Sequence, residues 1–141
     1  MLRYAIALLA TAALVGCENN GANVAAPRPQ TELAAYAATA QYPGSGLNDQ
    51  NPQLGALIEG QDGPIKIINF SNQPLNNVDV WINQSYVYQA QSVAPHATLT
   101  IPRNLFYNRS GQSLNNTNTT ITSVSLQTGN RVNKVLGPVQ E

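Results

Sequence analysis

The segment VDVWIN at 78–83 constrains the fold of this chain more than any other stretch. Val78, Val80 and Ile82 alternate strictly with more polar or aromatic residues. Successive residues of a β-strand point to opposite faces of a sheet, so this alternation predicts a strand with one buried face. Trp81 then lies on the face opposite the core. A chain with such a segment at its centre must build a sheet and cover it with a second layer.

Further segments with strand character follow at regular spacing, and turn-forming residues separate them. The expected strands are 65–70, 78–83, 85–90, 97–101, 119–128 and 131–136. Residues 71–77 form a turn cluster, and Gly129-Asn130 predicts a tight hairpin between the last two strands. No long helical pattern interrupts them. We therefore predict an all-β fold, a small antiparallel sandwich of immunoglobulin-like type.

The first residues have the layout of a secretory signal. Arg3 supplies a positive charge, 4–13 is almost entirely apolar, and small residues follow. A helix over 4–16 would rise only about 20 Å, whereas a hydrocarbon core needs about 30 Å. We therefore expect a cleaved signal and no membrane-spanning segment.

The residues Leu14-Val15-Gly16-Cys17 resemble the lipobox of bacterial lipoproteins. The resemblance implies cleavage before Cys17, diacylglycerol on the Cys17 sulfur, and an anchor in the cell envelope. An exported chain with one free cysteine would otherwise carry an unpaired reactive thiol, and two or three acyl chains hold a protein stably at a membrane. The alternative is an ordinary signal peptide in which the cysteine has no such role. Because Glu18 rather than Asp follows, the resemblance favours the outer membrane in a cell that has one.

The segment after Cys17 has the composition of a flexible tether, rich in Ala, Asn, Gln, Pro and Gly. Within it, residues 31–38 favour a short helix with Thr31 as a cap, although such a helix is too short to be stable alone. We predict three parts: a signal peptide at 1–16, a lipidated N-terminus and tether at 17–60, and the β-sandwich domain at 61–141.

The predicted domain also resembles small exported bacterial β-sandwich domains of immunoglobulin-like type. The matching positions are Asn69-Phe70-Ser71, Val78 to Asn83, Tyr86, Ala94-Pro95, Ile101, Phe106 and Gly111. Gln84 and His96 stand where glycine is usual. The resemblance implies a fold and no active site. A domain this small is marginally stable without a disulfide, so either the tether packs on it or it pairs with another chain.

Composition argues against several classes of function. The net charge is zero and only 10% of residues are charged, so no basic surface is expected and nucleic acid is not an expected partner. The single histidine, His96, follows Pro95 in a turn, and one histidine does not make a zinc site. A calcium loop around Asp49 and Asn51 lacks a closing glutamate. We expect no cofactor, no metal site and no catalytic residue.

One aromatic cluster is a candidate partner-binding site. If Asn83-Gln84 is a two-residue turn, Trp81, Tyr86 and Tyr88 share the face opposite the core and form a contact platform for a sugar, peptide or protein. Two alternatives remove it. The tether or a terminal segment covers the platform, or a three-residue turn rotates both tyrosines into the core.

Taken with the lipobox, these features lead us to expect a non-catalytic module, anchored in the membrane, that binds or supports an envelope protein or polymer. A small envelope hydrolase is the alternative from another class, with Glu59, Asp62 and Asp79 as its only plausible neighbouring carboxylates. An inhibitor of a foreign envelope enzyme differs only in its partner. The partner's identity and the oligomeric state stay open.

Overall fold

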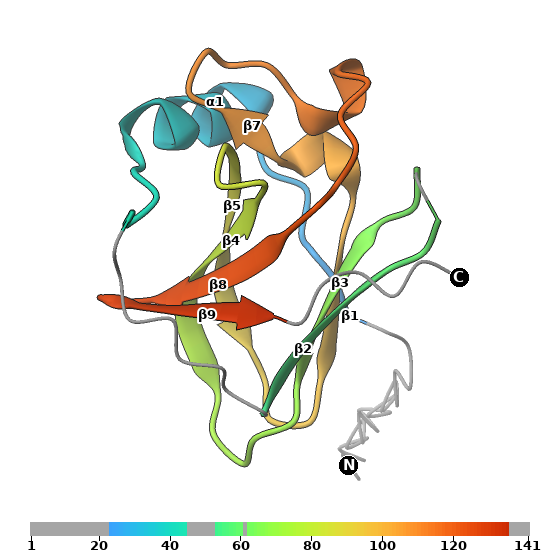
Figure 1. Cartoon of the computed structure of the whole chain (residues 1–141). Helices are drawn as coiled ribbons and strands as arrows, with labels where there is room; N and C mark the ends of the chain where they lie inside the picture. The colour runs from blue at the N-terminus through green and yellow to red at the C-terminus, as the bar shows by residue number, and fades with distance from the viewer. Residues whose placement is uncertain (1–22, 45–52, 61, 136–141) are drawn as a thin grey trace, which may run out of the picture.

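Two sheets packed face to face form the body of the protein, as a computed structural model shows (Figure 1). The structure describes residues 23–44, 53–60 and 62–135. The predicted signal and Cys17 lie outside the described residues, as do Asp49 and Asn51. Within the described part, no helix reaches the length and hydrophobicity that crossing a membrane requires.

The elements follow one another as β1 (Asn23–Val24), α1 (Gln30–Thr39), β2 (Leu54–Ile58), β3 (Ile65–Asn69), β4 (Leu75–Ile82), β5 (Tyr86–Val93), β6 (Thr98–Ile101), η1 (Arg103–Leu105), β7 (Tyr107–Asn108), η2 (Leu114–Asn116), β8 (Val124–Thr128) and β9 (Arg131–Val135). One sheet has the order β1-β6-β3-β2 and the other β7-β5-β4-β8-β9. All pairs are antiparallel except β1 with β6. The series β2-β3-β6 and β5-β4-β8-β9 matches strands A-B-E and C′-C-F-G of an immunoglobulin-like sandwich.

The alternation of β4 directs its apolar residues into the core. Val78, Val80 and Ile82 are completely buried, and so are Ile65, Ile67 and Ile101 of the other sheet. The predicted hairpin around Gly129-Asn130 is also present, with Thr128 paired to Arg131. The all-β, antiparallel sandwich predicted from the sequence is therefore confirmed.

Asn69 explains the Asn-x-Ser pattern at the end of β3. Its buried Nδ2 donates to the carbonyl oxygens of Gln73, Val93 and Ala94, at 2.8 to 3.2 Å. Its Oδ1 accepts from the amide and the hydroxyl of Ser71. One side chain thereby joins the turn after β3 to the turn after β5.

The expected tether at 17–60 is wrong over much of its length, because β1, α1 and β2 belong to the folded domain. Five residue pairs join β2 to β3. On α1, Leu33 and Ala37 are buried at 2% and 3% exposure. The expected helix is present, although it begins at Gln30 and Pro29 occupies the cap position instead of Thr31. Composition did not predict this packing, because alanine is common in flexible tethers and each buried alanine contributes only a small apolar area.

Candidate functional site

The turn between β4 and β5 contains three residues, and its length determines whether the predicted aromatic platform forms. The Ser85 amide donates to the Ile82 carbonyl at 3.0 Å, and the next strand pair is Ile82 with Tyr86. Compared with a two-residue turn, the register moves by one residue, which transfers alternate side chains to the other face. Tyr86 and Tyr88 consequently join the core face and are 7% and 4% exposed.

Trp81 stays on the outer face of its sheet but is covered. Only 3% of its surface is exposed. The Tyr42 ring packs edge-on against it with centroids 5.5 Å apart, and the indole Nε1 donates to Gln127 Oε1 at 2.9 Å. The expected exposed platform of Trp81, Tyr86 and Tyr88 is therefore wrong, and the segment that follows α1 provides the cover.

A polar contact holds α1 on the same outer face. The Tyr36 hydroxyl donates to Asp79 Oδ1 at 2.6 Å, and Gln89 Nε2 donates to the Tyr36 oxygen at 3.0 Å. Burial raises the pKa of the Asp79 carboxyl, while the hydrogen bonds from Tyr36 and Gln89 oppose the rise. Burial and then the contact with Asp79 raise the pKa of the Tyr36 hydroxyl. Asp79 is thus a structural carboxylate that fastens the helix to the sheet.

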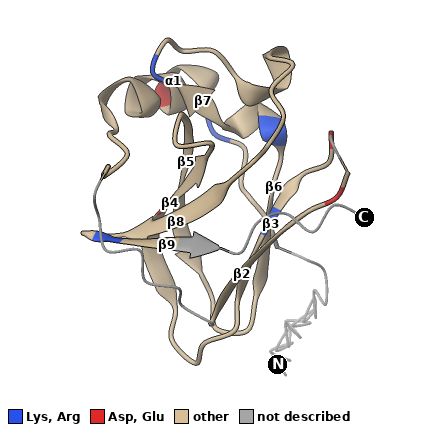
Figure 2. Ribbon diagram, viewed as in Figure 1, with Lys and Arg blue, Asp and Glu red and all other residues tan. Residues whose placement is uncertain are grey.

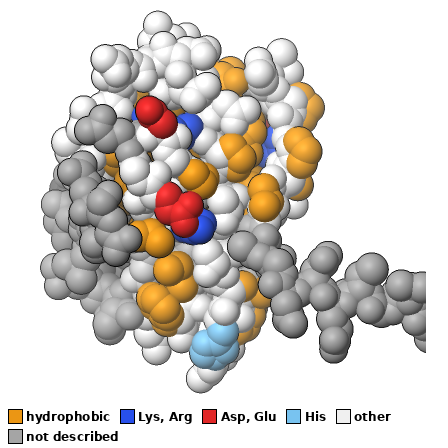
Figure 3. Space-filling view, turned by 90° about the vertical axis from the view of Figure 1, so that its right-hand side faces the viewer, with side chains coloured by type: hydrophobic (Ala, Val, Ile, Leu, Met, Phe, Trp, Pro, Cys, Tyr) orange, Lys and Arg blue, Asp and Glu red, His pale blue; other side chains and the backbone are white. Residues whose placement is uncertain are grey.

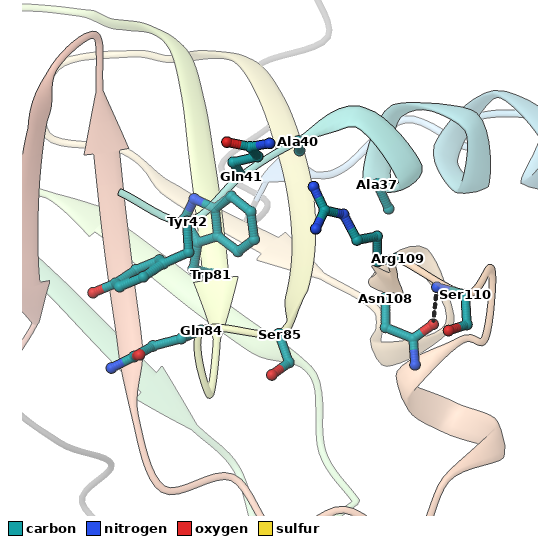
Figure 4. Close-up of a pocket in the computed structure, with 10 residues that line it drawn as sticks. All are labelled: Ala37, Ala40, Gln41, Tyr42, Trp81, Gln84, Ser85, Asn108, Arg109 and Ser110. Atoms are coloured by element: carbon teal, nitrogen blue, oxygen red, sulfur yellow. Dashed lines mark hydrogen bonds between the residues drawn. The ribbon is translucent and has the colours of Figure 1, made fainter. Parts of the chain in front are cut away.

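A groove of about 530 Å³ opens beside this covered tryptophan (Figure 4). It lies between the end of α1, the β4–β5 turn and the loop after β7. The lining residues are Ala37, Ala40, Gln41, Tyr42, Trp81, Gln84, Ser85, Asn108, Arg109 and Ser110. Its volume is within the range of small-molecule sites, and none of these residues is acidic.

The polar side chains of the groove divide into two groups. Asn108 has a structural role, since its Oδ1 accepts from the amides of Ser110 and Gln112 at 3.1 and 2.9 Å and closes the loop. Gln41, Gln84 and Arg109 are exposed and have no hydrogen-bond partner among the described residues. Among the described residues of the lining, Arg109 is the single charged side chain, in a molecule that carries few charges (Figure 2). These three side chains are available to a ligand.

The candidate catalytic residues lie in separate parts of the fold, since Glu59 and Asp62 share the connection between β2 and β3 whereas Asp79 is on β4. Asp79 lies on the outer face of one sheet, whereas Glu59 follows β2 of the other and pairs with Lys66. His96 is exposed in its turn, where its Nε2 contacts Asn72 Oδ1 at 2.6 Å. No group of three potential metal ligands occurs within the described ranges.

The outer face of the four-stranded sheet is the other surface to consider. Val24 and Phe70 are 63% and 53% exposed there. Figure 3 looks onto this side and shows hydrophobic side chains scattered around an acidic and a basic side chain that lie next to each other. Single exposed apolar residues of this kind are normal on a soluble surface. The groove beside Trp81 is the better candidate site.

Comparisons with models of protein families, with curated proteins and with solved structures found no match to this chain. Sequence reasoning did not select Gln41 or Arg109, because both lie in loops without a motif. One signal was visible, namely Gln84 at a turn position where glycine is usual.

Proposed function

We propose that this protein is a lipid-anchored, non-catalytic module of the cell envelope that presents its sandwich to an envelope protein or polymer. The observation that carries the proposal is Leu14-Val15-Gly16-Cys17 after an apolar segment. Acyl chains on Cys17 hold the domain at the membrane. Glu18 after the cysteine favours the outer membrane in a cell with two membranes.

The contacts of three acidic residues support binding rather than catalysis. Asp79 fastens α1, Glu59 pairs with Lys66, and Glu32 pairs with Arg28 at the start of α1. A general acid or base must instead be within reach of a substrate. A groove with unpaired polar side chains beside a rigid sheet is suited to recognition.

Substitution of the anchor residue tests this function. We expect Cys17→Ala to abolish incorporation of labelled palmitate and to release the protein from membranes or leave it uncleaved. Glu18→Gln keeps the cysteine and is the matched control, which we expect to remain acylated. Cys17→Ala protein that is cleaved and sediments with membranes as the unmodified chain does would refute the anchor.

A further inference from the structure

The backbone conformation of Gln84 is unusual for a glutamine. Among the described residues, four that are not glycine have positive φ, namely Asn77, Asn83, Gln84 and His96. Asn and His are several-fold enriched in this left-handed region, whereas glutamine is not. Gln84 has a φ of 60°. Glycine would adopt this conformation without strain, so the side chain needs another explanation.

Contacts within the protein do not provide that explanation. The Asn83 side chain ties its turn to the segment before β8, since its Oδ1 accepts from the amides of Thr122 and Ser123 at 2.8 and 3.0 Å. Gln84, in contrast, is exposed and has no hydrogen-bond partner among the described residues, although it lines the groove. A strained residue that persists without a structural contact points to a functional role.

The chemistry of the lining defines the ligand. Arg109 offers a planar guanidinium that suits a carboxylate, and the described lining residues include no acidic side chain that opposes it. The amides of Gln41 and Gln84 and the hydroxyl of Ser110 donate and accept hydrogen bonds, as sugar hydroxyls require. The Ser85 hydroxyl donates to the Asn83 carbonyl and keeps its capacity to accept. The aromatic part of the lining is Tyr42 and the nearly buried Trp81. Figure 4 shows Arg109 and Trp81 on facing sides of the opening.

We propose that this groove binds an acidic glycan, with Arg109 paired to a sugar carboxylate and Gln41 and Gln84 hydrogen-bonded to its hydroxyls. The proposal deepens the proposed function and rests on it, because the anchor places the groove against envelope polymers. Peptide recognition commonly uses a free sheet edge or an apolar groove, and this groove is bounded by a helix end, a turn and a loop. Uronic acids and muramyl sugars share the required chemistry.

Trp81 provides a built-in reporter, since it is the only tryptophan of the chain and lines the groove. The full chain, in a polyoxyethylene detergent without a sugar headgroup, is titrated with tetragalacturonate and with a muramyl disaccharide whose lactyl carboxylate is free. We expect saturable fluorescence changes with one or both, which identifies the source of the carboxylate. Maltotetraose is the neutral control, and the free stem peptide is the peptide control.

Two pairs of variants test the roles of the residues. Arg109→Gln should weaken binding of the acidic sugar about tenfold or more, the loss expected for a charged hydrogen bond. Arg131→Gln, an exposed arginine outside the groove, should leave it unchanged. Gln84→Gly should weaken binding while the melting temperature stays equal or rises. His96→Gly also replaces a left-handed residue but lies outside the groove, and should leave affinity unchanged.

Three results would overturn the proposal. These are no fluorescence response to either acidic sugar at millimolar concentration, binding of the stem peptide that equals or exceeds that of the acidic sugars, or unaltered affinity in both groove variants. The Cys17→Ala chain distinguishes failure of the glycan-binding proposal from failure of the proposed lipid anchor. If that chain stays on membranes yet the groove variants lose sugar binding, the anchor alone is refuted.

Discussion

Asn69 shows how much a single buried polar residue contributes to this sandwich. It is completely buried and makes five hydrogen bonds with three turn carbonyls and with Ser71. A buried polar group left without a partner costs about 1–3 kcal/mol. The carbonyls of Val93 and Ala94 would lose this donor together if the side chain were removed.

We therefore expect Asn69→Ala to lower the free energy of unfolding by about 3 kcal/mol or more. Urea denaturation of the variant and the unmodified chain measures the difference. Asn72→Ala is the control, because Asn72 is exposed and, among the described residues, its side chain is hydrogen-bonded to His96 alone. This substitution should cost less than about 1 kcal/mol. Similar losses in both variants would contradict the central role of Asn69.

Asp79 should make stability depend on pH in a direction opposite to that of most carboxylates. Its pKa is raised in the folded protein, mainly by burial, so the folded state favours the protonated form. Its stabilising contribution is complete below the unfolded pKa of about 3.9 and is lost as pH rises through the folded pKa.

Asp79→Asn isolates this contribution, since the amide oxygen still accepts the Tyr36 hydroxyl. We expect the unmodified chain to lose stability relative to the variant as the pH rises from acid to neutral, and the variant to be at least as stable at neutral pH. Urea denaturation across this pH range gives the difference. A relative gain by the unmodified chain on raising the pH would show that its hydrogen bonds outweigh burial.

At the scale of the element, α1 depends on docking for its existence. The helix has ten residues and no side-chain cap, and an isolated helix of this length is marginal in water. Leu33 and Ala37 are buried, and Tyr36 contacts Asp79. Tertiary contacts therefore supply the stability that the helix lacks by itself.

We expect residues 30–42 to resist limited proteolysis while the domain is folded. Leu33→Ala should cost about 2–5 kcal/mol, as truncation of a buried leucine does, and should open this segment to cleavage. Mass spectrometry of the fragments locates the cuts. Ala35→Ser, on the exposed side of α1, is the control. Rapid cleavage within 30–42 in the unmodified chain would show that α1 is not held on the sheet.

At the scale of the whole molecule, burial rather than charge holds the sandwich together. The chain has seven basic and seven acidic residues and no possible intramolecular disulfide. Within the described ranges, the ion pairs are Arg28–Glu32 and Lys66–Glu59, each with an exposed glutamate. Such surface pairs contribute about 0–1 kcal/mol.

The melting temperature should therefore respond weakly to salt. Between low and half-molar sodium chloride we expect a change below about 3 °C, since screening removes only small surface terms. Thermal denaturation followed by circular dichroism measures it. A larger fall in high salt would show that charge interactions beyond the two exposed pairs stabilise the fold.

Local patterns in the sequence determined the strands and their buried face. The alternation of 78–83 correctly assigned Val78, Val80 and Ile82 to the core, because side-chain direction in a strand depends only on the parity of the position. Gly129-Asn130 correctly marked the last hairpin, since a tight turn is a property of adjacent residues. The sequence contained one local indication of the groove, which is Gln84 at a turn position where glycine is usual.

Tertiary structure decided the register between β4 and β5 and the covering of Trp81. Asn83 is bonded to residues 120–123, about forty positions away along the chain, and the three-residue turn beside it sends Tyr86 and Tyr88 into the core. Trp81 is buried by Tyr42, which lies in a segment with the composition of a tether. Both outcomes depend on contacts between distant segments, which local composition and periodicity do not encode.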